Sequence, residues 1–283
     1  MKKNNILFQK IIVYIVIFWL FFFIFIPNLG LIFISFFQYN AIKIFDFILT
    51  FDNYKEIFNP VYYRVMLYSI YISFFSTLLC LLIGYPFSLI LATVVSKKWI
   101  SVMLFLLILP FWTNSLIRIY ALKIFFSKNG YLNSLLLSVK LINQPIDILY
   151  TEVGVIIGLV YLLLPFMIIP LFSSIQKIDK NCIEAAFDLG ANRLRVFFSI
   201  IFPLTISGVI SGSLLVFLSS IGLFYVSDII GGSRNLLIGN IIKNQFLYLR
   251  NWPFGSAMSI FLIFIMIIVS YIYYHILILF NKK

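Results

Sequence analysis

Six long apolar stretches, separated by shorter polar ones, dominate the pattern of hydrophobic and polar positions along the chain. Each is at least as long as the roughly 20 residues that an α-helix needs to cross the hydrocarbon layer of a bilayer. The pattern therefore predicts an all-α membrane protein, with residues 1–283 forming a single domain. We expect the spans at about 11–37, 65–95, 100–120, 153–172, 204–226 and 256–280.

Prolines lie within or at the ends of several predicted spans. Pro27 is expected to kink the first span or to end its membrane portion. Prolines in the other spans are tolerated where neighbouring helices or water in a cavity satisfy the carbonyl groups that they leave free. This pattern favours a helix bundle with a functional interior, and the residues concerned are Pro86, Pro110, Pro165 and Pro170.

Composition places the chain in lipid rather than in water. It is 63% hydrophobic and 11% charged, with a mean hydropathy of +1.10, whereas soluble domains carry about 25% charged residues. The net charge of +12 would point to nucleic acid in a soluble chain. Here the charges lie between apolar stretches, so we expect the lipid bilayer and no nucleic acid as a partner. The two cysteines lack metal-ligand or disulfide spacing, and no metal site is expected.

The orientation follows from the density of lysine and arginine, which are enriched in cytoplasmic segments. The basic start of the chain is followed by an apolar run without a signal-peptide cleavage site, so the first span is expected to be retained. Both termini are predicted to be cytoplasmic. The inner segments are then 1–10, 96–99, 173–203 and 281–283.

Residues 182–203 carry charges, alanines and a glycine between apolar stretches. Asn181 and Glu184 fit a capping box, in which each side chain binds a backbone N–H group of the other at a helix start. Gly190 can supply the left-handed residue that stops this helix, Asn192 can cap a second helix, and a proline closes the stretch. The first helix is predicted to lie outside the membrane with an exposed apolar stripe, which needs a partner.

This segment resembles the EAA motif of binding-protein-dependent ABC importer permeases. Glu184-Ala185-Ala186 is followed by Gly190 and then by Ile200-Ile201-Phe202-Pro203, with Phe202 where the family usually has leucine. The resemblance implies a six-helix, type I (MetI-like) transmembrane domain in which 173–203 is the cytoplasmic loop that couples to an ATPase. The residues implied in coupling are Glu184, Ala185, Ala186, Phe187, Gly190 and Pro203.

The resemblance extends over nearly the whole chain, to the spermidine/putrescine permeases of that family. It is carried by Leu109–Tyr120, Gly158–Met167, Gly222–Gly232 and Asn251–Gly255. It implies a bacterial inner-membrane complex with a second homologous permease, an ATPase dimer that binds ATP and Mg²⁺, and a periplasmic polyamine-binding protein. The chain has no GxxxxGK[ST] phosphate-binding loop, so we expect a non-catalytic subunit without a cofactor of its own.

A path for a polyamine needs carboxylates or carbonyl groups for its ammonium groups, and aromatic faces for cation–π contacts. Asp228 is the leading candidate, since an acidic group near membrane depth is a functional hypothesis by default; it is equally typical of a helix cap in a loop. Trp112 would also fit an interfacial aromatic belt. The substrate-path candidates are Asp228, Tyr225, Trp112, Asn114, Glu152 and Tyr161.

The remaining charged groups have structural or docking roles in this interpretation. Arg118 would repel a cationic cargo, so we expect it to pair with Asp147 or Glu152. The first outer loop is predicted to contain a short helix with Thr50 or Asp52 as its N-cap. Three carboxylates in this loop could dock the binding protein, and His275 is predicted to be structural. The three are Asp46, Asp52 and Glu56.

Three other functions are alternatives to this interpretation: an ABC permease for another small solute, an ion-coupled secondary transporter, and an intramembrane enzyme. A secondary transporter predicts inverted internal symmetry and ionisable residues in mid-span, and neither is evident in the sequence. HExxH and GxSxG motifs are absent from the sequence. The sequence leaves open the choice between spermidine and putrescine, and which face meets a second permease.

Overall fold

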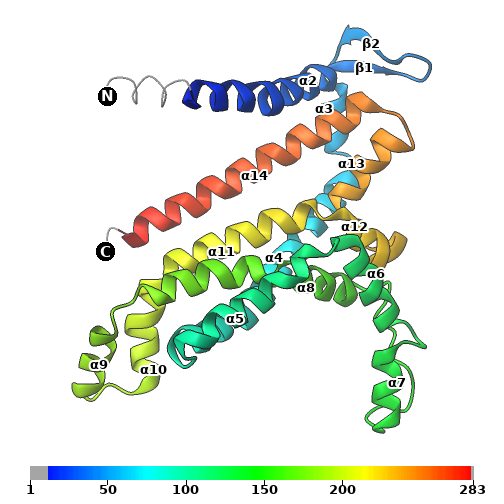
Figure 1. Ribbon diagram of the computed structural model, residues 1–283. Helices are drawn as coiled ribbons and strands as arrows, with labels where there is room; N and C mark the ends of the chain where they lie inside the picture. Colours follow the sequence, from blue (N-terminus) through cyan, green and yellow to red (C-terminus); the bar gives the residue numbers. More distant parts are fainter. Residues whose placement is uncertain (1–11, 282–283) are drawn as a thin grey trace. The chain divides into compact units, whose positions relative to one another are not determined.

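The computed structural model describes residues 12–281 and has two compact units (Figure 1). One comprises Met1–Tyr63 with Ile241–Ile265, and the other Arg64–Asn240 with Met266–Lys283. The predicted all-α class is confirmed by a mostly helical chain. Five of the described helices are long and apolar enough to cross a membrane, and a bent pair makes up to six. The five are Ile12–Ser35, Pro60–Thr93, Glu152–Gln176, Arg193–Gly222 and Trp252–Leu279.

The bent pair corrects the third predicted span, 100–120. Helix α5 (Lys97–Ile108) continues as the 3₁₀ turn η2 (Leu109–Trp112), and a new helix, α6, starts at Ser115 after a bend of 94°. Thr113 has an extended backbone, and the Asn114 side chain accepts the N–H of Leu116 at 2.8 Å. The polar pair Thr113-Asn114 therefore ends one helix and caps the next (α6, Ser115–Phe126; α7, Tyr131–Ser138).

Pro27 and Pro203 do not end the helices in which they lie. In both places a π-helical turn comes directly before the proline-containing helix: η1 (Phe21–Phe25) before α2 (Ile26–Ser35), and η3 (Phe197–Ile201) before α11 (Phe202–Gly222). The first N–H of each helix, at Ile26 and Phe202, binds the carbonyl five residues back. Because proline has no N–H to donate, the wider turn re-pairs the backbone. The fifth span therefore starts at Arg193 and ends at Gly222, where 204–226 was expected.

Small residues allow close helix packing in the core of the larger unit, where α11 packs against α8 (Glu152–Gln176). A Cβ atom on Gly208 would lie 2.5 Å from Ser174 Cβ, and one on Gly212 would lie 2.9 Å from Met167 Sδ. Gly84 also lets α4 (Pro60–Thr93) approach α8, with a hypothetical Cβ 3.1 Å from Met167 Cγ. Such close approach is how helices associate in lipid, where burial of apolar surface gives little driving force.

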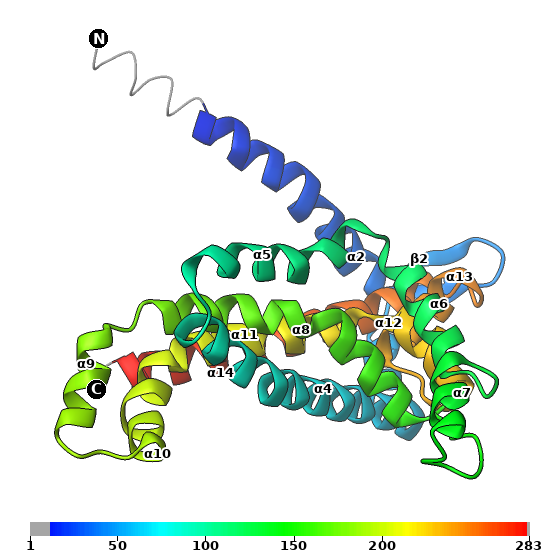
Figure 2. The same ribbon diagram turned by 60° about the horizontal axis from the view of Figure 1, so that its bottom comes forward.

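The two ends of the α8–α11 pair carry different structures. Figures 1 and 2 show α9 (Lys180–Asp188) and α10 (Arg193–Val196) beyond one end, and α6 and α7 at the other. The loop predicted to be cytoplasmic, 173–203, and the helices α6 and α7 thus lie at opposite ends of this unit. Most lysines near the termini that supported the predicted orientation lie outside the described residues, so cytoplasmic termini stay a prediction.

The smaller unit contains a hairpin of strands β1 (Phe37–Asn40) and β2 (Ile44–Leu49), followed by α3 (Asp52–Ile57). Asn53 holds these elements together by donating to the carbonyls of Ser35 and Phe37, both at 2.9 Å. The remaining helices are α13 (Ile238–Leu247) and α14 (Trp252–Asn281), each of which continues from one unit into the other.

The predicted cap of α3 is corrected: Phe51 occupies the N-cap position without a side-chain bond. Thr50 instead accepts the N–H of Asp52 at 3.1 Å and donates its hydroxyl to the Asp52 carboxylate at 2.8 Å. That hydrogen bond and the ion pair with Lys55 at 3.0 Å lower the pKa of Asp52. The carboxylate is therefore ionised at neutral pH and exposed to solvent.

Candidate functional site

Helix α9 begins earlier than the capping box predicts. Asp179 is its N-cap, and its carboxylate accepts the N–H of Asn181 at 3.0 Å. Asn181 lies inside the first turn, so the predicted pairing of Asn181 with Glu184 is wrong. Since α8 ends at Gln176, the chain turns within three residues, and Asp179, with its extended backbone, is placed to start the next helix.

The end of α9 has the conformation that the sequence predicts. Gly190 has a φ of +80°, in the left-handed region. Its N–H binds the carbonyl of Phe187 at 2.8 Å, and the N–H of Ala191 binds the carbonyl of Ala186 at 3.1 Å. These two bonds form a Schellman motif. Asn192 then caps α10 as predicted, accepting the N–H of Arg195 at 2.8 Å.

The α9–α10 hairpin exposes large apolar side chains. Phe187 is 43% exposed, Leu189 89% and Leu194 69%. Glu184 and Ala185 are also exposed on α9, whereas Ile183 and Ala186 are partly covered. Arg193 and Arg195 are exposed beside Leu194. Exposed apolar side chains beside charged ones, in a hairpin that joins the fourth span to the fifth, are typical of a protein-docking surface.

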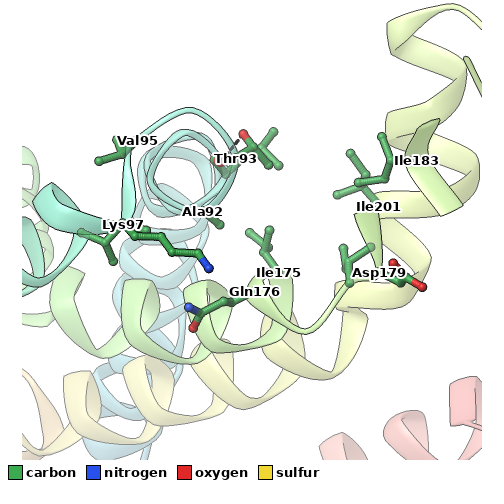
Figure 3. A pocket seen from close by; sticks show the side chains of 12 residues that line it. Ala92, Thr93, Val95, Lys97, Ile175, Gln176, Asp179, Ile183 and Ile201 are labelled. Carbon is green, nitrogen blue, oxygen red and sulfur yellow. Dashed lines mark hydrogen bonds between the residues drawn. The ribbon is translucent and has the colours of Figure 1, made fainter. Parts of the chain in front are cut away.

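A groove of about 410 Å³ lies at the base of α9 (Figure 3). Ile183 of α9 lies on one side of it, and the end of α4 with the start of α5 forms the other side. Lys97 extends its ammonium group toward Gln176, between the two sides. The groove separates α9 from the α4–α5 corner.

Nearer the middle of α8, the break between η2 and α6 borders a pocket of about 520 Å³, which Leu162, Leu163 and Phe166 also line. Two of the predicted path residues, Asn114 and Tyr225, line this pocket together. Arg118 lines it as well, and its guanidinium carbon lies 5.0 Å from the centre of the Phe111 ring. The pocket therefore combines an amide, a phenol and a permanent positive charge.

Arg118 does not form the ion pair that we expected. Asp147 pairs with Lys128 at 3.1 Å, and no ion pair to Arg118 occurs among the described residues. Its Nε atom is buried without a hydrogen-bond partner in the described part of the chain. The sequence could not reveal this, because Arg118 lies on α6 and Asp147 lies after α7, and no local pattern fixes how these two segments lie relative to one another.

Asp228 lies in an irregular segment that follows the end of α11. The chain continues as α12 (Phe224–Val226), the π turn η4 (Ser227–Gly231) and the 3₁₀ turn η5 (Gly232–Arg234). Gly232 has a φ of +62°, and a Cβ there would lie 2.7 Å from the Tyr150 ring, so the predicted tight turn requires glycine. The Asp228 carboxylate is exposed and accepts a hydrogen bond from Asn240.

Two buried asparagines that sequence reasoning missed hold this segment in place. Asn240 also donates to the carbonyl of Phe224 at 3.0 Å and accepts the N–H of Leu237 at 2.8 Å. Asn235 donates to the carbonyls of Tyr150 and Gly231 at 3.0 and 2.9 Å. The available signal was an amide within apolar sequence, but asparagine is common throughout the chain and the signal is weak.

Glu152 lies at the start of α8, after its N-cap Thr151. Its carboxylate lies beside the hydroxyl of Tyr68, which donates to Asn235 at 2.9 Å. Tyr68 was not singled out from the sequence. The Glu152 carboxylate thus neighbours the asparagine-held segment, which also contains Asp228, and both carboxylates are exposed.

The other two path candidates are exposed aromatic residues that the structure does not bring together with the carboxylates. Trp112 is 77% exposed and packs edge-on against Phe105 at 5.7 Å. Tyr161 is 44% exposed on α8. His275 stacks on Tyr271 at 6.1 Å on α14.

Comparison with known proteins identifies relatives over the whole length of the chain. Residues 84–283 match the family described as "Binding-protein-dependent transport system inner membrane component". The chain is 50% identical over 283 residues to the spermidine/putrescine transport system permease protein PotB of Haemophilus influenzae, covering 100% of this chain and 99% of that protein. PotB of Escherichia coli is 52% identical over 265 residues, covering 94% of this chain and 96% of that protein.

Solved structures with the same fold are ABC transporters. The crystal structure of a bacterial alginate ABC transporter, in complex with an alginate pentasaccharide-bound periplasmic protein, matches with a TM-score of 0.76 and 17% identity. The match covers 97% of this chain and 94% of that chain. The MetNI methionine ABC transporter matches with a TM-score of 0.58 and 14% identity, covering 77% of this chain and 94% of that chain.

Proposed function

The chain belongs to the family of binding-protein-dependent transport system inner membrane components, and from that premise we propose that it is a polyamine permease of an ATP-driven importer. As a member of this family it is a non-catalytic, multi-pass subunit of the inner membrane. The proposed cargo rests on one observation: the chain is 50% identical over its full length to permeases named for spermidine and putrescine. ATP and Mg²⁺ are bound by the separate ATPase subunits.

The α9–α10 hairpin is the proposed docking site for the ATPase. Its support is the exposed patch of Phe187, Leu189 and Leu194, since burying apolar surface contributes about 25 cal/mol per Å². The proposed coupling residues Glu184, Ala185 and Ala186 lie on α9 beside this patch, whereas Gly190 sets the end of the helix and Pro203 lies in α11. The hairpin leads directly into the core helices on both sides, so a displacement of α9 acts on both α8 and α11.

Asp228 and Glu152 are the proposed carboxylates of the solute path. Both are exposed and border the segment that Asn235 and Asn240 hold, and each can replace water around an ammonium group. The aromatic candidates Tyr225, Trp112 and Tyr161 would add cation–π contacts of about 0.5–2 kcal/mol each. Several weak sites suit transport, because a single deep site would retain the cargo.

The positive charge of Arg118 disfavours a stable binding site for a cationic cargo beside Asn114. A positive charge 4 Å from the guanidinium is repelled by about 4 kcal/mol at an effective dielectric constant of 20. We therefore assign Asn114 and Tyr225, which share a pocket with Arg118, to passage rather than to tight binding.

The proposed partners are an ATPase dimer, a second homologous permease and a periplasmic polyamine-binding protein. The exposed carboxylates Asp46, Asp52 and Glu56 of the smaller unit are candidate contacts for the binding protein. Asp52 is ionised at neutral pH and therefore available to a basic surface.

The test is ATP turnover by the purified complex in lipid nanodiscs. Binding protein loaded with spermidine or putrescine should stimulate hydrolysis several-fold over the same protein without ligand. Binding proteins loaded with a sugar or an amino acid serve as controls for the alternative cargoes. Stimulation by one of these, with none by either polyamine, would refute the cargo assignment and keep the family assignment.

A further inference from the structure

Arg118 contacts an aromatic ring, but its hydrogen-bonding capacity is incompletely satisfied. Its guanidinium carbon lies 5.0 Å from the centre of the Phe111 ring, and Phe111 packs edge-on against Phe166 with ring centres 5.3 Å apart. The side chain is partly buried, and its Nε atom has no hydrogen-bond partner among the described residues. The aromatic contact orients the planar group, and at least one of its donors is left without an acceptor.

No carboxylate of this chain serves as the missing partner. All nine acidic residues lie within the described part of the chain. Asp52 pairs with Lys55 and Asp147 with Lys128, and no ion pair to Arg118 is found among the described residues. A guanidinium stays charged at any physiological pH. Arg118 is partly buried, and its Nε–H has no acceptor among the described residues, so the group can take a further acceptor from outside the chain.

The depth of the pocket limits what that partner can be. Leu162, Leu163 and Phe166 line it, and they lie in the middle of the 25-residue helix α8. At 1.5 Å per residue these positions are about 15–21 Å from the start of the helix, within a hydrocarbon layer of about 30 Å. A folded domain of a water-soluble binding protein does not reach this depth, and a cationic cargo is repelled by Arg118.

We propose that the Arg118 pocket receives an aspartate or glutamate side chain from a membrane helix of the second permease subunit. This inference rests on the proposed function, because it requires a complex of two permeases. The guanidinium fork suits a carboxylate, with which it can form two parallel hydrogen bonds. The pair also removes the charge that opposes passage of an ammonium group beside Asn114 and Tyr225.

The first experiment measures how fast the second permease dissociates from the tagged chain in the purified complex. R118Q and R118E should raise the dissociation rate about tenfold or more, because each leaves a buried carboxylate without its partner. R118K keeps the charge and should have a smaller effect. K128Q is the matched control: it removes one positive charge from an exposed ion pair and should leave the rate unchanged.

The second experiment identifies the partner. Each membrane-embedded aspartate and glutamate of the second permease is changed to lysine in the R118E background, and one of these changes should restore slow dissociation. The proposal is overturned if R118Q dissociates as slowly as K128Q, or if no charge reversal in the second permease restores R118E. Binding of an anionic solute that R118Q abolishes, with normal dissociation, would also overturn it.

The readout separates this inference from the cargo assignment. Dissociation is measured without any polyamine, so a complex that fails to respond to spermidine or putrescine would refute the cargo and leave the Arg118 result interpretable. If R118Q fails to fold, R118K and the rescue of R118E still decide the question.

Discussion

Replacing Gly190 with alanine is expected to weaken binding of the ATPase by about 5- to 30-fold. No atom lies within 4 Å of a Cβ placed on Gly190, so a methyl group meets no obstacle. The cost is the left-handed backbone at φ +80°, which an L-residue adopts at about 1–2 kcal/mol. If docking requires the Schellman turn, this cost appears in the dissociation constant, and each 1.4 kcal/mol is a factor of ten.

Two variants isolate the backbone conformation as the cause. Gly222 also has no atom within 4 Å of a hypothetical Cβ, and its φ is outside the left-handed region. Gly222→Ala should therefore leave ATPase binding unchanged. Gly190→Asn should retain most of the affinity, because asparagine is the residue that most often replaces glycine in this position of a helix end.

The assay is titration of detergent-solubilised permeases with the ATPase subunit, followed by polyamine-stimulated hydrolysis in nanodiscs. The level of inserted protein in membranes controls for folding. The reasoning is refuted if Gly190→Ala and Gly222→Ala bind the ATPase equally well, because the turn would then have no part in docking.

Three further substitutions test other parts of the molecule. Glu184→Lys reverses a charge on the exposed side of α9; it should leave the chain inserted but abolish stimulation of ATP hydrolysis, and normal stimulation would contradict the docking role. Asp228→Asn should raise the KM for spermidine uptake about tenfold, as expected for a hydrogen bond to a charged group, without changing ATPase binding; unaltered uptake kinetics would remove Asp228 from the path. Gly208→Val places a branched side chain where a Cβ is already 2.5 Å from Ser174 Cβ. It should lower the free energy of unfolding by about 1–3 kcal/mol. An unchanged melting temperature would contradict this, because it would show that α8 and α11 can separate there without a loss of stability.

The spans were predictable because long apolar runs determine them, whereas their ends depend on backbone pairing. A proline usually ends a helix, and only the π turns before Pro27 and Pro203 show that these two helices continue. The sequence predicts one span over 100–120, and its bend of 94° at Thr113-Asn114 emerges only in the structure, where α6 contacts α7, η4 and α8.

The candidate site shows the same division between local and long-range effects. Gly190 and Asn192 act on backbone groups within a few residues, so motif reasoning predicted their conformations correctly. The capping box at Asn181 failed because Asp179, two residues earlier, is the N-cap and accepts the N–H of Asn181. Asn235 acts on Tyr150, which lies 85 residues away, and no local pattern indicates such a contact.

The π turn η3 divides the fifth span into two helical arms, α10 and α11. The glycine contacts at Gly208 and Gly212 hold α11 close against α8, whereas α10 lies before these contacts and runs at an angle to α11 (Figure 1). Turns of this kind inside helices frequently occur at functional sites. A load on the α9–α10 hairpin therefore reaches α11 through this joint, whose angle sets how much of the displacement is passed on to the glycine-packed core.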